Sequence, residues 1–251
     1  MINARQLAIT LCGAAMFSIA HAEDNHNPDN ARAHLQAHHG GGLFSYVELE
    51  RLEYLSNDGE PQFLWDVQGW YGGDVNKLWL KSEGEYAFSG GGLEEAEIQA
   101  LWSRAVGSYF DLQAGVRHDF APGDDRTFAV IGAQGLTPYL FEIDTAIFVS
   151  EDGDVSARLE AEYEFLVTQR LILQPRAELN FEFQDAPAYE LGSGLSSVEL
   201  GGRLRYEIRR QFAPYVGVSW RRAYGDTARY IRADGGEPGG VSFVAGLRMW
   251  F

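Results

Sequence analysis

The chain has 251 residues and carries 36 acidic against 20 basic side chains, for a formal net charge of −16. That acidity argues against nucleic acid as a partner and favours the binding of cations. The length fits one large β domain, and a single cysteine allows no disulfide framework within it.

The first 22 residues have the pattern of a cleaved secretory signal peptide. Arg5 supplies a positive start, an apolar run follows over 7–20, and Ala-His-Ala at 20–22 gives a small-residue cleavage site. The apolar run is shorter than the roughly 20 residues that a membrane helix needs. Cys12 follows Leu11 rather than a small residue, which disfavours the alternative of a lipoprotein.

Residues 23–42 are predicted to form a flexible periplasmic tail, because they are rich in Asn, Pro and Gly and show no alternation. The tail contains His26, His34, His38 and His39. Imidazole suits Cu(II), Ni(II) and Zn(II), and Cu(II) is the tightest bound of these. The tail is therefore a candidate metal site, with a linker that contains incidental histidines as the alternative.

From Leu43 onward apolar and polar residues alternate with a period of two, which predicts β-strands. Twelve such segments follow one another: 43–55, 63–71, 78–88, 95–102, 110–119, 127–134, 139–147, 155–165, 171–183, 198–208, 214–222 and 241–251. The segment 127–134 is apolar on both faces and is the least decisive. Pro175 costs one ladder hydrogen bond, so a bulge is expected there.

The polar faces of these segments are densely charged with both signs, which a soluble core does not tolerate but a wet barrel lumen does. We therefore predict an all-β fold, an antiparallel transmembrane β-barrel of about twelve strands spanning 43–251, of the bacterial outer-membrane type. A soluble sandwich is the alternative for any one strand alone. The last strand, 241–251, should pair with the first and close the sheet.

The connections support this interpretation, because tight turns alternate with longer ones and the two longest, near 185–196 and 223–240, fall on the same side. Aromatic residues near strand ends are expected to form interfacial girdles in contact with outer-membrane lipid: Tyr46, Tyr54, Trp70, Trp79, Tyr109, Tyr139, Trp220 and Trp250.

Two further groups of residues are candidates for metal binding. The barrel has one histidine, His118, which by parity shares a face with the lipid-facing residues and would join a lumen site only if a bulge turned it inward. The acidic candidates of the lumen are Asp66, Glu83, Glu85, Glu97 and Asp144. We find no nucleophile–base motif, so we expect no enzyme activity, and a lipid-acting barrel enzyme is disfavoured.

Several long stretches resemble the copper resistance protein B family, namely residues 63–85, 111–120, 159–163, 168–176, 204–210 and 212–217. The resemblance covers 43–251 and implies an outer-membrane protein that binds copper and exports or sequesters it, in partnership with a periplasmic multicopper oxidase. Many members carry a long Met- and His-rich amino-terminal region. Here the tail is short and lacks methionine, which favours histidine ligands and Cu(II) over thioether ligands and Cu(I).

The sequence thus predicts an outer-membrane copper-binding barrel that confers copper tolerance, with domains at 1–22, 23–42 and 43–251. The alternative is a general cation-selective small porin that has no dedicated metal site.

Overall fold

The computed structural model describes residues 42–57, 60–89, 91–121 and 125–251. The predicted signal peptide and all of the tail except Gly42 lie outside these residues. The strands are β1 (Phe44–Asn57), β2 (Glu60–Gly72), β3 (Asn76–Ala87), β4 (Gly92–Ala105), β5 (Phe110–Ala121), β6 (Arg126–Leu136), β7 (Glu142–Ser150), β8 (Val155–Glu162), β9 (Phe165–Leu166), β10 (Leu171–Glu182), β11 (Gly194–Tyr206), β12 (Phe212–Ala223) and β13 (Gly239–Trp250).

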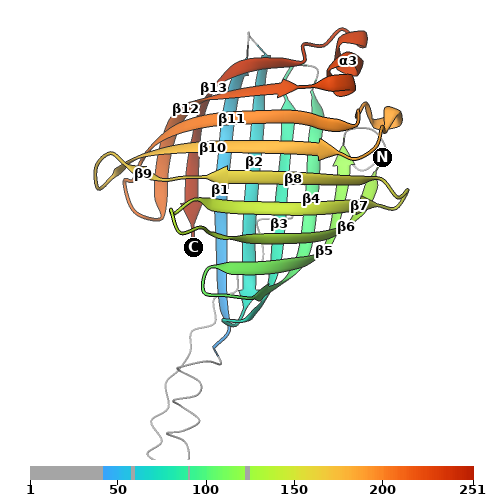
Figure 1. The fold of residues 1–251 in the computed structure, drawn as a ribbon. Helices are drawn as coiled ribbons and strands as arrows, with labels where there is room; N and C mark the ends of the chain where they lie inside the picture. Colours follow the sequence, from blue (N-terminus) through green and yellow to red (C-terminus); the bar gives the residue numbers. More distant parts are fainter. Residues whose placement is uncertain (1–41, 58–59, 90, 122–124) are drawn as a thin grey trace, which may run out of the picture. The chain divides into compact units, whose positions relative to one another are not determined.

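These strands form one closed antiparallel barrel, as the sequence predicts (Figure 1). Each strand pairs with its neighbour in the sequence, and β13 returns to pair with β1. At this seam the Phe251 N–H donates to the Val47 carbonyl over 2.9 Å, and the Val47 N–H donates to the Phe251 carbonyl over 3.1 Å. Closure leaves no strand edge unpaired, which is the condition for a sheet to span lipid.

The barrel has twelve strands because β8 and β9 together make one. Both pair with β10, and their ladder is interrupted at the two residues between them, 163 and 164. Pro175 of β10 lies opposite this interruption, since Arg176 pairs with Glu162 and Leu173 pairs with Phe165. The bulge expected in β10 at Pro175 is not found, because the register of β10 with β11 is continuous there. Proline has no N–H to give to the ladder, and the irregularity falls on the neighbouring strand instead.

The charged faces point into the lumen and the apolar faces point outward. On β8, for example, the Leu159 side chain is exposed on the outer surface, whereas Glu160 lines the interior cavity described below. β6 is apolar on both faces for a simple reason. Its Phe128 and Val130 point inward and pack in an interior cluster with Trp79, Leu101 and Phe148, whereas Ile131 is 70% exposed outside.

The two ends of the barrel differ in the length of their connections. At the end that holds the C-terminus, called here the turn end, the connections are 73–75, 106–109, 137–141, 167–170 and 207–211. At the opposite end, called the loop end, lie the two longest connections, 183–193 and 224–238. The prediction that the two longest connections fall on one side is therefore confirmed. A strict alternation of short and long connections is not found, because the other loop-end connections, 58–59, 88–91, 122–125 and 151–154, are as short as those of the turn end.

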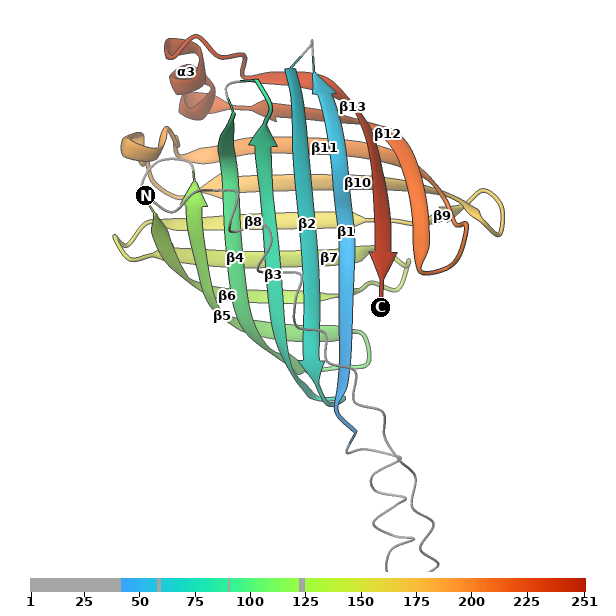
Figure 2. The ribbon, with the colours of Figure 1, turned by 180° about the vertical axis from the view of Figure 1, so that it is seen from behind.

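The two long connections contain short helices and pack against each other at the loop end (Figure 2). The first contains η1 (Pro187–Tyr189) and the second contains α3 (Gly225–Ala233). The Gly192 N–H donates to Thr227 Oγ1 over 2.9 Å. A Cβ on Gly192 would lie 2.5 Å from Cβ of Asp226, so this approach requires glycine. Throughout the described residues, no helix is long and apolar enough to cross a membrane.

The prediction of aromatic girdles is correct for only some of its members. Tyr54, Tyr109 and Tyr139 are exposed, with exposed fractions of 50%, 69% and 81%. Trp220 shares the outward face of its exposed neighbours Val216 and Val218 on β12.

The other four aromatic residues lie on the inner face. Trp79 is buried in the interior cluster. The Tyr46 ring centroid lies 6.3 Å from that of Trp70 and 6.1 Å from that of Trp250. Trp70 and Trp250 share the parity, and therefore the face, of the inward-facing Gln68 and Arg248. Assigning these residues to the girdle from their position near strand ends was wrong, because the face is set by parity.

Candidate functional site

The lumen contains an ion-pair network, and several of its members are almost inaccessible to solvent. Glu53 is fully buried, and the guanidinium of Arg203 donates to its two carboxylate oxygens over 2.5 and 3.1 Å. Arg51 contacts Asp66 at 2.9 Å and Glu83 at 2.5 Å. An isolated charge would be very unfavourable here, so each must be neutralised by a partner of the opposite sign.

Glu199 of β11 is the most connected carboxylate of this network. Its oxygens lie 3.2 Å from Arg221, 3.5 Å from Arg176 and 3.9 Å from both Arg51 and Arg203. Four guanidinium groups on four strands therefore share one anion. This arrangement ties β1, β10, β11 and β12 together from the inside.

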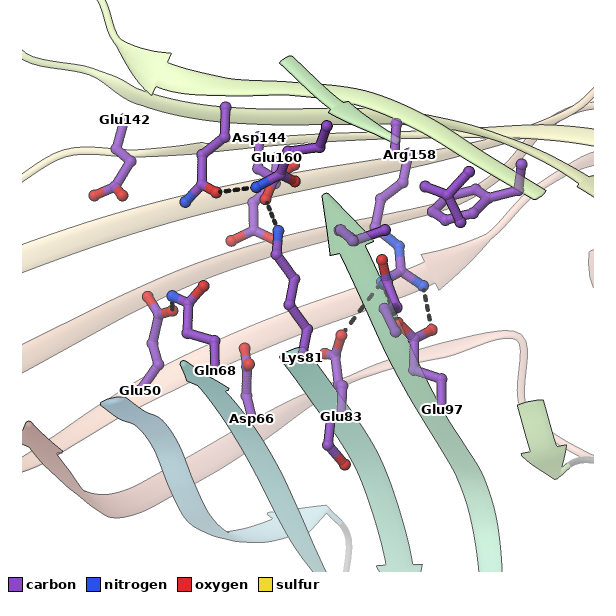
Figure 3. A pocket seen from close by; sticks show the side chains of 18 of the residues that line it. Glu50, Asp66, Gln68, Lys81, Glu83, Glu97, Glu142, Asp144, Arg158 and Glu160 are labelled. Atoms are coloured by element: carbon purple, nitrogen blue, oxygen red, sulfur yellow. Dashed lines mark hydrogen bonds and ion pairs between the residues drawn. The ribbon is translucent and has the colours of Figure 1, made fainter. Parts of the chain in front are cut away.

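Two basic side chains reach across the lumen between strands that are far apart in the sheet. Lys81 rises from β3 to contact Asp144 on β7 (Figure 3). Arg158 on β8 donates to Glu83 on β3 over 3.3 Å and to Glu97 on β4 over 3.0 Å. Glu97 is also held by Arg117 at 2.8 Å.

Beside these bridges lies a cavity of about 80 Å³. At roughly 10–15 Å³ for each water molecule, it has room for a small group of waters or one hydrated ion. Its wall includes two basic side chains, Lys81 and Arg158, and eight carboxylates: Glu50, Asp66, Glu83, Glu97, Glu142, Asp144, Glu160 and Glu162 (Figure 3). Three further arginines, Arg51, Arg117 and Arg176, contact carboxylates of this wall from outside the cavity. Eight carboxylates thus face five basic side chains, and the remaining negative charge attracts cations.

The structure brings most of the predicted acidic candidates together. Asp66, Glu83, Glu97 and Asp144 all line the cavity. Glu85 also points inward, but it lies outside the cavity and is held by Arg221 at 2.5 Å. Each of the five candidates contacts at least one arginine or lysine.

Sequence reasoning did not name as site candidates the other four carboxylates of the cavity: Glu50, Glu142, Glu160 and Glu162. Alternation does place Glu160 and Glu162 on the charged face of their strand. Glu50 is harder to find, because a bulge between Leu49 and Arg51 lets the consecutive residues Glu50 and Arg51 both face the lumen.

His118 stays on the outer face of the sheet. It pairs in register with Ile98, which is 43% exposed on the outside. Its Nδ1 lies 3.0 Å from Thr127 Oγ1, and its Nε2 lies 3.9 Å from an Asp125 carboxylate oxygen. The bulge of β5 falls beyond it, at Phe120, and does not turn it inward.

The remaining histidine candidates, His26, His34, His38 and His39, lie outside the described residues. Among the residues that the structure does describe, no three His, Cys, Asp or Glu side chains are placed to hold one metal ion together. The lumen therefore offers a negatively charged space rather than a preformed chelating group within this part of the chain.

Comparison with known proteins identifies the family. Residues 43–251 match the family described as copper resistance protein B precursor (CopB). The chain belongs to the copper resistance protein B family. It is 48% identical over 223 residues to "Copper resistance protein B" of Escherichia coli, which covers 88% of this chain and 75% of that protein. It is also 48% identical over 214 residues to the "Copper resistance protein B homolog" of Pseudomonas syringae pv. tomato, covering 85% and 72%.

The fold of this CopB family member is shared with solved outer-membrane barrels. The NanC porin aligns with a TM-score of 0.54 over 81% of this chain and 98% of that chain, at 10% sequence identity. At that identity the likeness concerns the fold alone. The predicted family and fold class are thus both confirmed.

Proposed function

We propose that this barrel acts in copper tolerance at the outer membrane of a Gram-negative cell, where it binds copper and sequesters it or passes it out of the periplasm. Membership of the copper resistance protein B family supports the role in copper tolerance. The observation that carries the proposal beyond the family is the cavity wall, where eight carboxylates outnumber the five basic side chains that contact them and draw cations into the lumen.

The turn end is proposed to face the periplasm, after export by a cleaved signal peptide at 1–22. Short turns are typical of the periplasmic side of bacterial barrels. The chain enters β1 at the turn end, where Phe44 pairs with Gly72 next to the connection 73–75. The tail at 23–42 would then meet periplasmic copper first.

We place the tightest Cu(II) site on the tail histidines rather than on the lumen carboxylates. The five acidic candidates already contact arginine or lysine, so an ion that bound them would have to displace a cation of the protein. The imidazoles of His34, His38 and His39 lie within six residues of one another, with His26 nearby, and Cu(II) prefers such nitrogen ligands.

The test is a Cu(II) titration of the refolded full barrel and of the variant His34→Ala/His38→Ala/His39→Ala. The variant should lose the tightest site and keep its fold, and wild-type affinity should fall as pH drops through about 6.5, because neutral imidazole is the ligand. His118→Ala removes an imidazole outside the tail and serves as the matched control. If the triple variant binds Cu(II) as tightly as wild type, the site lies in the barrel.

The same proposal assigns no enzyme activity to the barrel, and it names outer-membrane lipid and a periplasmic multicopper oxidase as partners. The alternative, a general cation-selective porin, would show a large conductance that copper does not change. The ion pairs that cross the lumen favour the copper-binding role over an open porin.

A further inference from the structure

Strand β3 carries two lysine–aspartate pairs of the same chemistry that differ in the strands they join. Lys77 contacts Asp111 on β5, two strands away in the sheet, with an Nζ–Oδ2 distance of 2.9 Å. Lys81 contacts Asp144 on β7, four strands away. The first pair joins strands of the same wall. The second spans the lumen from one wall toward the other (Figure 3).

The two pairs are otherwise closely matched. The lysine side chains are 20% and 17% exposed, and the aspartate side chains are 20% and 29% exposed. Each ammonium also lies over a tryptophan ring, with Lys77 Nζ 5.4 Å from the Trp70 centroid and Lys81 Nζ 5.8 Å from the Trp79 centroid. The two pairs differ in the strands they join, and only the Lys81–Asp144 pair crosses the lumen.

A second bridge crosses the lumen next to Lys81. Arg158 extends from β8 to Glu83 and Glu97, on strands five and four places away in the ring. Its guanidinium carbon lies 5.8 Å from the Phe148 ring centroid. The rings under both bridges, Trp79 and Phe148, belong to one buried cluster, so a shared apolar support holds the two cationic groups in place.

We propose that the lumen is a cation pathway and that the Lys81–Asp144 and Arg158–Glu83/Glu97 bridges hold it shut. In the cavity beside the bridges, eight carboxylates outnumber the five basic side chains that contact them, so the ions that enter are cations. Lys81 and Arg158 occupy the lumen as tethered cations and block the passage of mobile ones. The gate lies within the barrel, and its action does not depend on the tail or on copper.

The test is the KCl conductance of the refolded full chain in planar lipid bilayers. Lys81→Met and Asp144→Asn both break the cross-lumen bridge, but the first makes the lumen more negative and the second makes it less negative. Both should raise the conductance several-fold over wild type, and Lys81→Met should show the greater preference for K⁺ over Cl⁻. Lys77→Met and Asp111→Asn break the matched pair along the wall and should leave the conductance unchanged.

Any one of three outcomes would contradict the proposal that these bridges close the lumen. Wild type could conduct as well as the Lys81 variant, the Lys77 and Asp111 variants could open the lumen equally, or Lys81→Met could raise the conductance while Asp144→Asn lowers it. The last result would mean that lumen charge alone sets the conductance.

Insertion of each variant is checked by its heat-resistant mobility on a gel. If neither Lys81→Met nor Asp144→Asn inserts, Arg158→Met takes their place, because Glu97 and Glu83 then keep Arg117 and Arg51 as partners. A conductance of Arg158→Met no greater than that of wild type would also reject the proposal.

Discussion

Leu159→Arg tests the inside–outside assignment most directly, because the outward Leu159 lies close to the middle of the membrane. It is four residues from Val155, where β8 begins at the loop end. At about 3.3 Å per residue and a strand tilt of about 40°, this separation is roughly 13 Å along the strand and 10 Å along the membrane normal. The apolar band of such barrels is about 25 Å tall, so the side chain faces lipid within a few ångströms of the midplane.

An arginine facing lipid at this depth costs about 2 to 4 kcal/mol, which lowers the folding equilibrium constant by roughly thirty-fold to several-hundred-fold. The neighbouring change Glu160→Gln lies on the lumen side, where it removes one partner of Arg176 while Glu162, Glu178 and Glu199 remain. It should therefore insert nearly as wild type does.

Both variants are refolded into lipid vesicles, and their stability is compared by urea titration of the heat-resistant form. A stable Leu159→Arg barrel beside a Glu160→Gln variant that fails to insert would show that the two faces of β8 have been assigned the wrong way round.

Two further predictions concern the seam and the long connections. Deleting Phe251 removes both of its backbone hydrogen bonds to Val47 and should lower the yield of heat-resistant barrel; an undiminished yield would contradict the role given to this residue. At the loop end, hydrogen bonding to Asp234 and its negative charge raise the pKa of Glu190 above its ordinary value. The docked loops then bind the proton more tightly than separated ones, so docking should strengthen as pH falls and weaken as pH rises through the raised pKa. Protection of the Gly192 amide from hydrogen exchange should increase as docking strengthens at lower pH. The Glu190→Gln variant should lose this pH dependence.

The strands and their faces were predictable because alternation is a local property. The run from Val155 to Glu162 identifies both the strand and its inward face without knowledge of any neighbour. The aromatic residues show the limit of a weaker argument. Trp79 shares parity with Lys81, so alternation places it inside, whereas its position near a strand end suggested the membrane interface.

The partners across the lumen could not be predicted in the same way. Alternation shows that Lys81 and Asp144 both face inward, but which residues meet depends on the tilt and stagger of the closed barrel. The bulge beside Glu50 is a similar case, because one extra residue changes the parity of everything after it. The helix α3 lies in a connection whose length alone was evident.

Closure through the pairing of β1 with β13 has a consequence for the order of biogenesis. Until β13 is in place, β1 presents a row of backbone N–H and C=O groups without partners, and each such group costs several kcal/mol in hydrocarbon. A barrel that lacks its final strand is thus unsuited to the bilayer interior. We expect the exported chain to remain at the membrane surface or with a chaperone until residues 239–251 have arrived, so that synthesis of the last strand determines when insertion can be completed.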